Sequence, residues 1–186
     1  SMASVSEPSS GASAPAMKRL MAARSERQVA SSTPPRELAP PATPRIAVIA
    51  IGDSAVTGPA RQRIEERLSD AGFDVVDTQL IDGVEGRGDL PGIFTALRRE
   101  ATVAIVVKAD PVGSAPITFY GQVDTLYTAN LSVRAYFVPE KRALGPGFRE
   151  RVDFTAMSAG DKAEEAISPR LDALLGSLAQ YRRRRG

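Results

Sequence analysis

The sequence predicts an α/β (α+β mixed) fold, in which helices pack on a sheet of parallel and antiparallel strands. Two observations lead to this prediction. Residues 46–51 (Ile-Ala-Val-Ile-Ala-Ile) are an uninterrupted apolar run, which is typical of a strand buried on both faces. Residues 129–139 instead alternate between apolar and polar side chains, as an antiparallel strand with one covered face does. The expected element order is β-α-β-α-β-β-β-β-α.

The first half of this order predicts parallel β-α-β units with right-handed crossovers. In the first helix, Ala60, Ile64 and Leu68 recur at helical spacing, after a loop in which Ser54 or Thr57 is expected to cap and Pro59 to open the helix. Asp89 is expected to cap the second helix, with Pro91 in its first turn. The strands are expected over residues 46–51, 73–79, 102–107, 116–128, 129–139 and 148–156.

The second half predicts an antiparallel meander that is closed by a helix. A turn is expected at 139–142, and the last helix is expected to begin at Ser158 or Asp161 and to kink or restart at Ser168-Pro169. Its apolar stripe consists of Ala163, Ile167, Leu171, Leu174, Leu175 and Leu178. In the strand 129–139, one face is expected to carry Leu131, Val133, Ala135 and Phe137, and the other Ser132, Arg134 and Tyr136.

The amino-acid composition divides the chain into three regions. Residues 1–44 are rich in Ser, Ala and Pro and predict a disordered, semi-stiff linker. Within them, residues 16–29 have helical spacing, which indicates either a transient solvated helix or one that forms on a partner. Residues 45–181 are expected to form the folded module, and residues 182–186 a basic tail.

The residue types exclude several kinds of chemistry. The chain has no cysteine, so thiolate nucleophiles, disulfides and cysteine-based metal sites are excluded. It also has no histidine, which is the commonest general base near neutral pH and the commonest transition-metal ligand. Carboxylates are scattered without a spacing that pairs them on one helix face, so no metal or cofactor is predicted.

The sequence pI near 9.1 comes from the two ends of the chain. Between residues 46 and 181, 19 acidic side chains outnumber 14 basic ones. A module with this balance has no general electrostatic reason to bind nucleic acid, so no nucleic-acid partner is expected.

The segment Gly52-Asp53-Ser54, directly after the first strand, resembles the nucleophile block of the GDSL esterases, over the seven residues 52–58. That family needs a histidine to accept the serine proton, and this chain has none. A nucleotide site in the same loop lacks the Walker lysine and the dinucleotide-binding glycine spacing. A hydrolase or nucleotide-binding enzyme that uses the loop 52–59 is therefore the alternative to a non-catalytic module.

Partner-binding candidates lie in the antiparallel half and at the C-terminus. Exposed aromatic residues beside arginine suit a protein-binding sheet face, and the competing interpretation is that the tyrosines lie beneath a helix. The basic run at the C-terminus indicates either contact with anionic lipid or nucleic acid, or a solvated tail. The candidates are Tyr120, Arg134, Tyr136, Arg182, Arg183, Arg184 and Arg185.

The element order and the segment Ala129–Val138, with the strand 148–154 and the helix beginning near Lys162, resemble an α/β envelope-protein domain. That domain occurs in the N-terminal part of TolB, in the curli-secretion lipoprotein and in penicillin-binding-protein activator lipoproteins. The same region is similar to the C-terminal extension of some proteobacterial serine/threonine kinases, which follows a Pro/Ala-rich linker. The resemblance implies a bacterial envelope or periplasmic location and a sensory or docking role without catalytic residues.

We therefore expect a non-catalytic binding or regulatory module of a larger bacterial protein, with a protein or envelope ligand as its partner. Ser1-Met2 is typical of what remains after tag cleavage, which favours a fragment. No apolar run reaches the roughly 18 residues of a membrane-spanning helix. Membrane contact is expected only through a removed segment or through the arginine tail.

Overall fold

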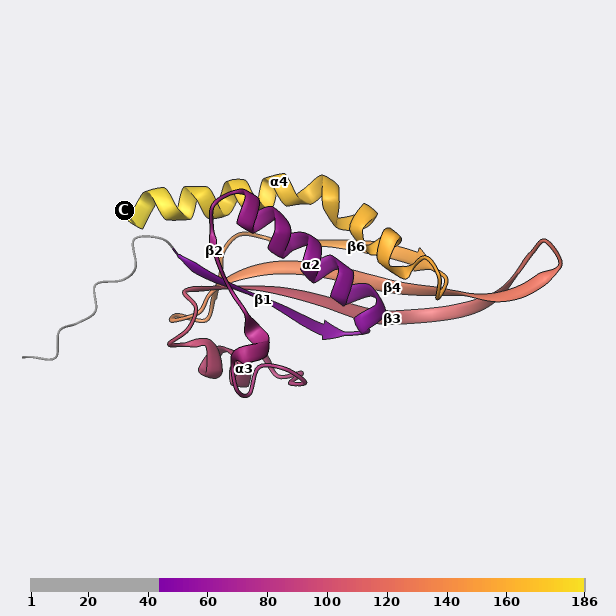
Figure 1. Ribbon diagram of the computed structural model, residues 1–186, viewed down its shortest axis with the longest axis horizontal. Helices are drawn as coiled ribbons and strands as arrows, with labels where there is room; N and C mark the ends of the chain where they lie inside the picture. Colours follow the sequence, from indigo (N-terminus) through magenta and orange to yellow (C-terminus); the bar gives the residue numbers. More distant parts are fainter. Residues whose placement is uncertain (1–43, 186) are drawn as a thin grey trace, which may run out of the picture. The chain divides into compact units, whose positions relative to one another are not determined.

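Six strands form one mixed sheet in the order β2-β1-β3-β4, and β5 and β6 both pair with β4 (Figure 1). The computed structural model describes residues 44–185. Strand β1 runs parallel to both of its neighbours, β2 and β3, whereas every strand that pairs with β4 is antiparallel to it. The predicted α/β class with a mixed sheet is confirmed. The strands are β1 (Arg45–Gly52), β2 (Asp74–Val76), β3 (Val103–Phe119), β4 (Gln122–Phe137), β5 (Arg142–Ala143) and β6 (Phe148–Phe154).

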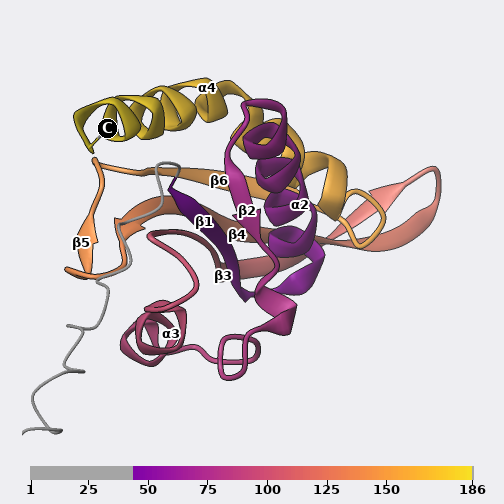
Figure 2. The same cartoon turned by 60° about the vertical axis from the view of Figure 1, so that its left-hand side comes forward.

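Helices lie on both faces of this sheet (Figures 1 and 2). The chain leaves β1 in one direction across the sheet to reach β2, and then returns past β1 to reach β3. Two right-handed crossovers in opposite directions place their helices on opposite faces, so α2 and α3 lie on different sides. The helix α4 packs beside α2 and over β6. The helices are α2 (Ser54–Asp70), α3 (Leu90–Leu97) and α4 (Ala159–Arg185), with a short 3-10 helix at Thr78–Leu80.

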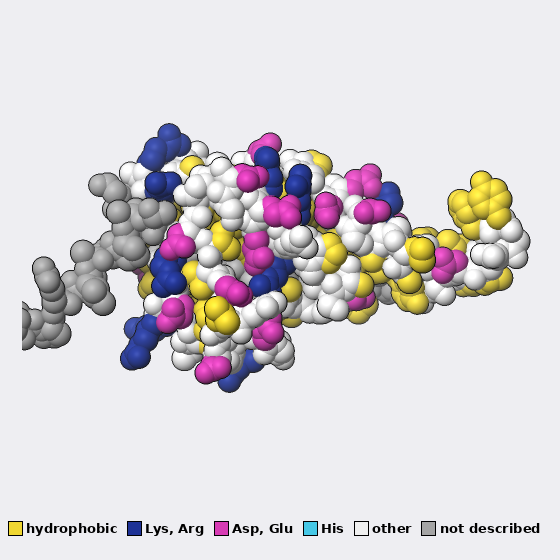
Figure 3. Space-filling view, in the orientation of Figure 1, with side chains coloured by type: hydrophobic (Ala, Val, Ile, Leu, Met, Phe, Trp, Pro, Cys, Tyr) yellow, Lys and Arg dark blue, Asp and Glu magenta, His cyan; other side chains and the backbone are white. Residues whose placement is uncertain are grey.

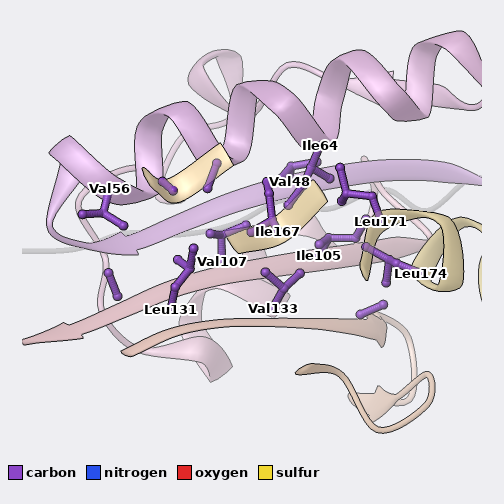
Figure 4. Packing of buried hydrophobic residues seen from close by; sticks show 14 of the residues in the cluster. Val48, Val56, Ile64, Ile105, Val107, Leu131, Val133, Ile167, Leu171 and Leu174 are labelled. Carbon is purple, nitrogen blue, oxygen red and sulfur yellow. The ribbon is translucent and has the colours of Figure 1, made fainter. Parts of the chain in front are cut away.

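The larger hydrophobic core lies between the sheet and the pair α2 and α4 (Figure 4). Ile64 of α2 and Ile167 of α4 are almost completely buried there against the sheet residues Ile105 and Leu131. An ion pair of 2.7 Å between Arg67 and Asp172 joins the two helices at the surface. The predicted apolar stripe of the last helix is confirmed, with Leu175 only partly buried.

The antiparallel half differs from the prediction at its centre. The predicted strand 116–128 is wrong, because the chain reverses within it at Tyr120-Gly121. Both turn residues have positive φ, 49° and 80°, as a two-residue hairpin turn of type I′ requires. The third strand therefore continues past residue 107 to Phe119. Its pairing with β4 shifts in register between Pro111 and Gly113.

Element boundaries at the parallel end also differ. The helix α2 begins at Ser54 rather than after the loop 52–59, because Asp53 caps it by accepting a hydrogen bond of 2.9 Å from the Ala55 amide. Pro59 lies inside this helix and does not open it. The predicted strand 73–79 is three residues long, since Asp77 caps the 3-10 helix that follows. The Asp89 cap of α3 is as predicted, with its carboxylate 2.9 Å from the Gly92 amide.

The last helix is continuous. It runs from Ala159 through Pro169 to Arg185, so of the two outcomes predicted for Ser168-Pro169, a kink or a restart, the restart does not occur. Positive side chains are favourable at a helix C-terminus, which accounts for the arginine run continuing the helix. Among residues 44–185, no helix is long and apolar enough to cross a membrane. Except for Pro44, the predicted linker over residues 1–44 and the predicted helix over 16–29 lie outside the described residues.

Candidate functional site

The face of the sheet that carries α3 is only partly covered. This helix has eight residues and packs over the β1 end of the sheet, where Ile93 and Leu97 contact Ala47 and Ala104 in a second, smaller core. Tyr136 of β4 marks the border of this cover, with its ring centroid 5.2 Å from that of Phe94. Beyond this border, the side chains of β3, β4 and β6 on the same face are mostly polar or charged and reach solvent, whereas Val106 of β3, opposite Arg134, is apolar and buried.

Strand register brings three basic residues of this open face around one serine. Ser132 of β4 lies directly opposite Lys108 of β3 and directly opposite Arg149 of β6, so the three form a row across the sheet. Arg134 follows two residues along β4 and therefore points to the same face. Directly opposite residues of adjacent strands share a face, so the three cations converge on the surface around Ser132.

A groove of about 380 Å³ opens over this row. Its polar lining is basic: it includes three cations and no carboxylate. Its apolar lining comes from the strands, from the start of α3 and from the loop before β6. The lining residues are Leu90, Val106, Lys108, Ser132, Val133, Arg134, Tyr136, Pro146, Gly147, Phe148 and Arg149.

The loop between β5 and β6 positions Arg134. Its Nη2 atom donates a hydrogen bond of 3.1 Å to the carbonyl oxygen of Pro146. The loop lies against β4 through a second hydrogen bond of 2.8 Å, from the Leu144 amide to the Ala135 carbonyl. Gly147 makes this approach feasible, because it has a φ of +68° and a Cβ there would lie 2.6 Å from the Val133 carbonyl oxygen.

The other cations are held less firmly. Lys108 makes an ion pair of 2.7 Å with Asp110, but about half of its side-chain surface is exposed. The Ser132 hydroxyl donates to the Lys108 carbonyl oxygen at 3.3 Å. Among the side chains that the structure describes, Arg149 has no hydrogen-bonded or ionic partner. The groove thus offers one fixed guanidinium, one exposed ammonium and one uncommitted guanidinium to an anionic ligand.

The structure separates the candidates that the sequence indicated. Arg134 and Tyr136 both line the groove, and Tyr136 also lies beneath α3, as the competing interpretation held. Tyr120 is 97% exposed at the tip of the β3–β4 hairpin, and hydrophobic side chains gather at the far end of this hairpin (Figure 3). Arg182 and Arg183 are exposed on the last turns of α4. Arg184 and Arg185 continue the same helix.

No sequence pattern indicated Lys108, Ser132 and Arg149 as site residues. Alternation placed Ser132 on the face of Arg134, but periodicity within one strand does not reveal which residues of other strands lie opposite it. Lys108 follows directly on the apolar run 103–107, and Arg149 is the second residue of a strand rich in charges. Neither position has a local signal that distinguishes it from an ordinary solvated side chain.

The Gly-Asp-Ser segment has a structural explanation. Gly52 has a φ of +97°, and a Cβ at this position would collide with the Ala109 main chain of the neighbouring strand β3. Asp53 is the cap of α2, and Ser54 is the first residue of that helix with an exposed side chain. The chain contains no histidine to activate Ser54. The geometry therefore does not favour a hydrolase at this loop.

Comparisons with known proteins give structural similarity without an assigned function. No protein-family model and no curated protein match the sequence. The structure is similar to the hypothetical protein CT253 of Chlamydia trachomatis, with a TM-score of 0.44 and 8% identity over 73% of this chain and 98% of that chain. It is also similar to lipoprotein GNA1162 of Neisseria meningitidis, with a TM-score of 0.42 and 14% identity over 74% of this chain and 96% of that one.

A third similar structure is a minor lipoprotein of Acinetobacter baumannii, with a TM-score of 0.39 and 8% identity over 69% of this chain and 92% of that chain. With TM-scores of 0.39 to 0.44, these similarities carry no conclusion about activity, partner or location. The resemblance to TolB, to curli-secretion and activator lipoproteins and to kinase extensions stays a prediction.

Proposed function

We propose that this chain is a non-catalytic binding module of a larger bacterial protein, and that its partner binds on the open half of the sheet. The observation that carries the proposal is the groove itself. One face of the sheet is covered by α2 and α4 apart from a hollow of about 500 Å³ between α4 and β6, whereas the other face carries a basic groove of about 380 Å³ beside the short helix α3. A concave site with apolar walls and a few convergent polar groups is the usual form of a binding site.

The groove residues support binding rather than chemistry. Lys108, Arg134 and Arg149 can attract and orient an anion, but positive charge alone supplies neither a nucleophile nor a base. The lining carries two hydroxyl groups, those of Ser132 and Tyr136, and the Ser132 hydroxyl already donates its proton to a main-chain carbonyl. The envelope location that the sequence resemblance implies belongs to the same proposal.

Site-specific photo-crosslinking in the full-length parent protein tests this proposal. A photoreactive phenylalanine analogue replaces Tyr136 in the groove, and in a matched control it replaces Gln62 on the exposed surface of α2, on the opposite side of the sheet. We expect irradiation of the living cells to give a discrete protein adduct from position 136 and none from position 62. Adducts of equal yield at both positions, or none at position 136, would overturn the proposal.

A further inference from the structure

We infer that the groove recognises an extended peptide segment of its partner that carries carboxylates next to apolar side chains. This inference rests on the proposed function and names the chemistry of the partner. Charge is the first argument. The lining holds Lys108, Arg134 and Arg149 and no acid, although acidic side chains outnumber basic ones over residues 46–181. A local basic site on an otherwise acidic surface selects for a negatively charged ligand.

The spacing of the cations is the second argument. Neighbouring strands lie about 4.8 Å apart, so the backbones that carry Lys108 and Arg149 are separated by about 10 Å across Ser132. Ser132 and Arg134 are two residues apart on β4, which corresponds to about 7 Å. In an extended peptide, side chains at positions i and i+2 share a face and have this same spacing of about 7 Å. The backbone of Arg134 lies about 8.5 Å from those of Lys108 and Arg149, which combines the spacing along β4 with that between strands. The long Glu, Lys and Arg side chains can span this difference, so two or three alternating carboxylates can reach the cations.

The walls of the groove are the third argument. Leu90 and Tyr136 line it on the side of α3, and Pro146 lines it in the loop before β6, whereas the side chain of Phe148 packs on the core under α2 and α4. A free phosphate would contact the cations but leave the apolar groups of Leu90, Tyr136 and Pro146 in water. A peptide that carries both acidic and apolar side chains can cover the walls and neutralise the cations together.

The test is a titration of the full 186-residue chain with synthetic peptides, followed by NMR chemical shifts. The probe is Ac-Leu-Ser-Glu-Ser-Glu-Ser-Leu-amide, in which the leucine and glutamate side chains share one face of the extended chain, and the matched probe has glutamine in place of each glutamate. Inorganic phosphate is the third titrant. We expect the glutamate peptide to shift the amides of the groove strands and the glutamine peptide to bind at least about tenfold more weakly, with the difference decreasing at high salt.

Charge-reversal variants locate the interaction. The double variant Lys108→Glu/Arg149→Glu should weaken glutamate-peptide binding at least about tenfold, because it reverses two of the three groove cations. The control Arg98→Glu/Arg99→Glu changes the net charge equally at exposed positions outside the groove and should bind as the unmodified chain does. Arg149→Gln is a milder variant that removes one uncommitted cation, so a weaker but measurable loss is expected even if the double variant unfolds.

Three results would overturn the inference. These are equal affinity for the glutamate and glutamine peptides, equal binding by the groove and control variants, or phosphate shifting the same amides as strongly as the peptide. Crosslinking at position 136 separates this inference from the proposed function. If a specific adduct forms there but the chain does not prefer the acidic peptide, the acidic peptide is refuted as the ligand, and the proposal that a partner binds on this face is unaffected.

Discussion

The carbonyl oxygen of Pro146 holds the guanidinium of Arg134 at the edge of the groove, through a hydrogen bond of 3.1 Å. This contact joins a loop to the middle of a long strand, and it depends on how closely the loop approaches β4. The residue after Pro146 is Gly147, whose positive φ and contact with the Val133 carbonyl leave no room for a side chain. Changes at this glycine should therefore affect both stability and the basic site.

Gly147→Ala is expected to destabilise the fold by about 1–3 kcal/mol, because alanine is strained at positive φ and its Cβ would push the loop away from β4. Urea denaturation measures this change. The control is Gly86→Ala, which has a φ of +72° but open space around the Cβ, and should cost only the backbone strain of about 1 kcal/mol. Equal losses for the two variants would show that the loop does not need this close approach.

The hydroxyl of Thr128 on β4 donates to the carboxylate of Asp153 on β6 and is the largest of the causes that lower the pKa of that carboxyl. Desolvation raises the pKa and is the second-largest effect, and nearby Arg151 lowers the pKa further by its charge and by a hydrogen bond. We expect Thr128→Val to raise the pKa of Asp153 more than Arg151→Gln does. Carboxyl NMR titration measures both values, and the reverse order would contradict the assigned cause.

The same pair predicts a pH dependence. A carboxyl whose pKa is lowered by folding stabilises the native state above its unfolded pKa, of about 3.9, and this contribution is lost as the pH falls through the folded pKa. As the pH falls below about 5, the unmodified protein should therefore lose more stability than the Thr128→Val variant does. Thermal unfolding at a series of pH values tests this expectation, and parallel curves for the two proteins would refute it.

The β3–β4 hairpin should contribute to stability only at its base. Leu131→Ala, in the core beneath α2 and α4, is expected to destabilise the protein by about 2–5 kcal/mol. Val123→Ala, near the hairpin tip where the side chain is 76% exposed, should change stability by less than about 0.5 kcal/mol. Chemical denaturation compares them. A large loss for Val123→Ala would mean that the tip is packed in solution.

Pro169 interrupts the hydrogen bonds of α4 without ending the helix. Proline in a helix interior lacks an amide hydrogen and is unfavourable relative to alanine by about 3 kcal/mol, part of which is offset because proline also restricts the unfolded chain. Because Pro169 is exposed, Pro169→Ala should raise stability by roughly 1–3 kcal/mol, which thermal unfolding can measure. An unchanged midpoint would indicate that α4 does not continue through this position.

The sequence by itself determined which side chains face inward. Leu131, Val133 and Ala135 alternate as a strand requires, and Ile167 and Leu171 repeat as a helix requires, and all five are buried. These assignments succeed because side-chain direction follows from backbone geometry within one element. The mixed sheet was predictable for the same reason, since strands buried on both faces and strands with one covered face have different patterns.

Only the tertiary structure decided where the hairpin turns and which residues meet across strands. The reversal at Tyr120-Gly121 has no strong local signal, because apolar and β-favouring residues continue on both sides of it. The row of Lys108, Ser132 and Arg149 exists because three segments distant in sequence are paired in one particular register. Register depends on the sum of contacts across the whole sheet, so no single segment contains the information that assembles the groove.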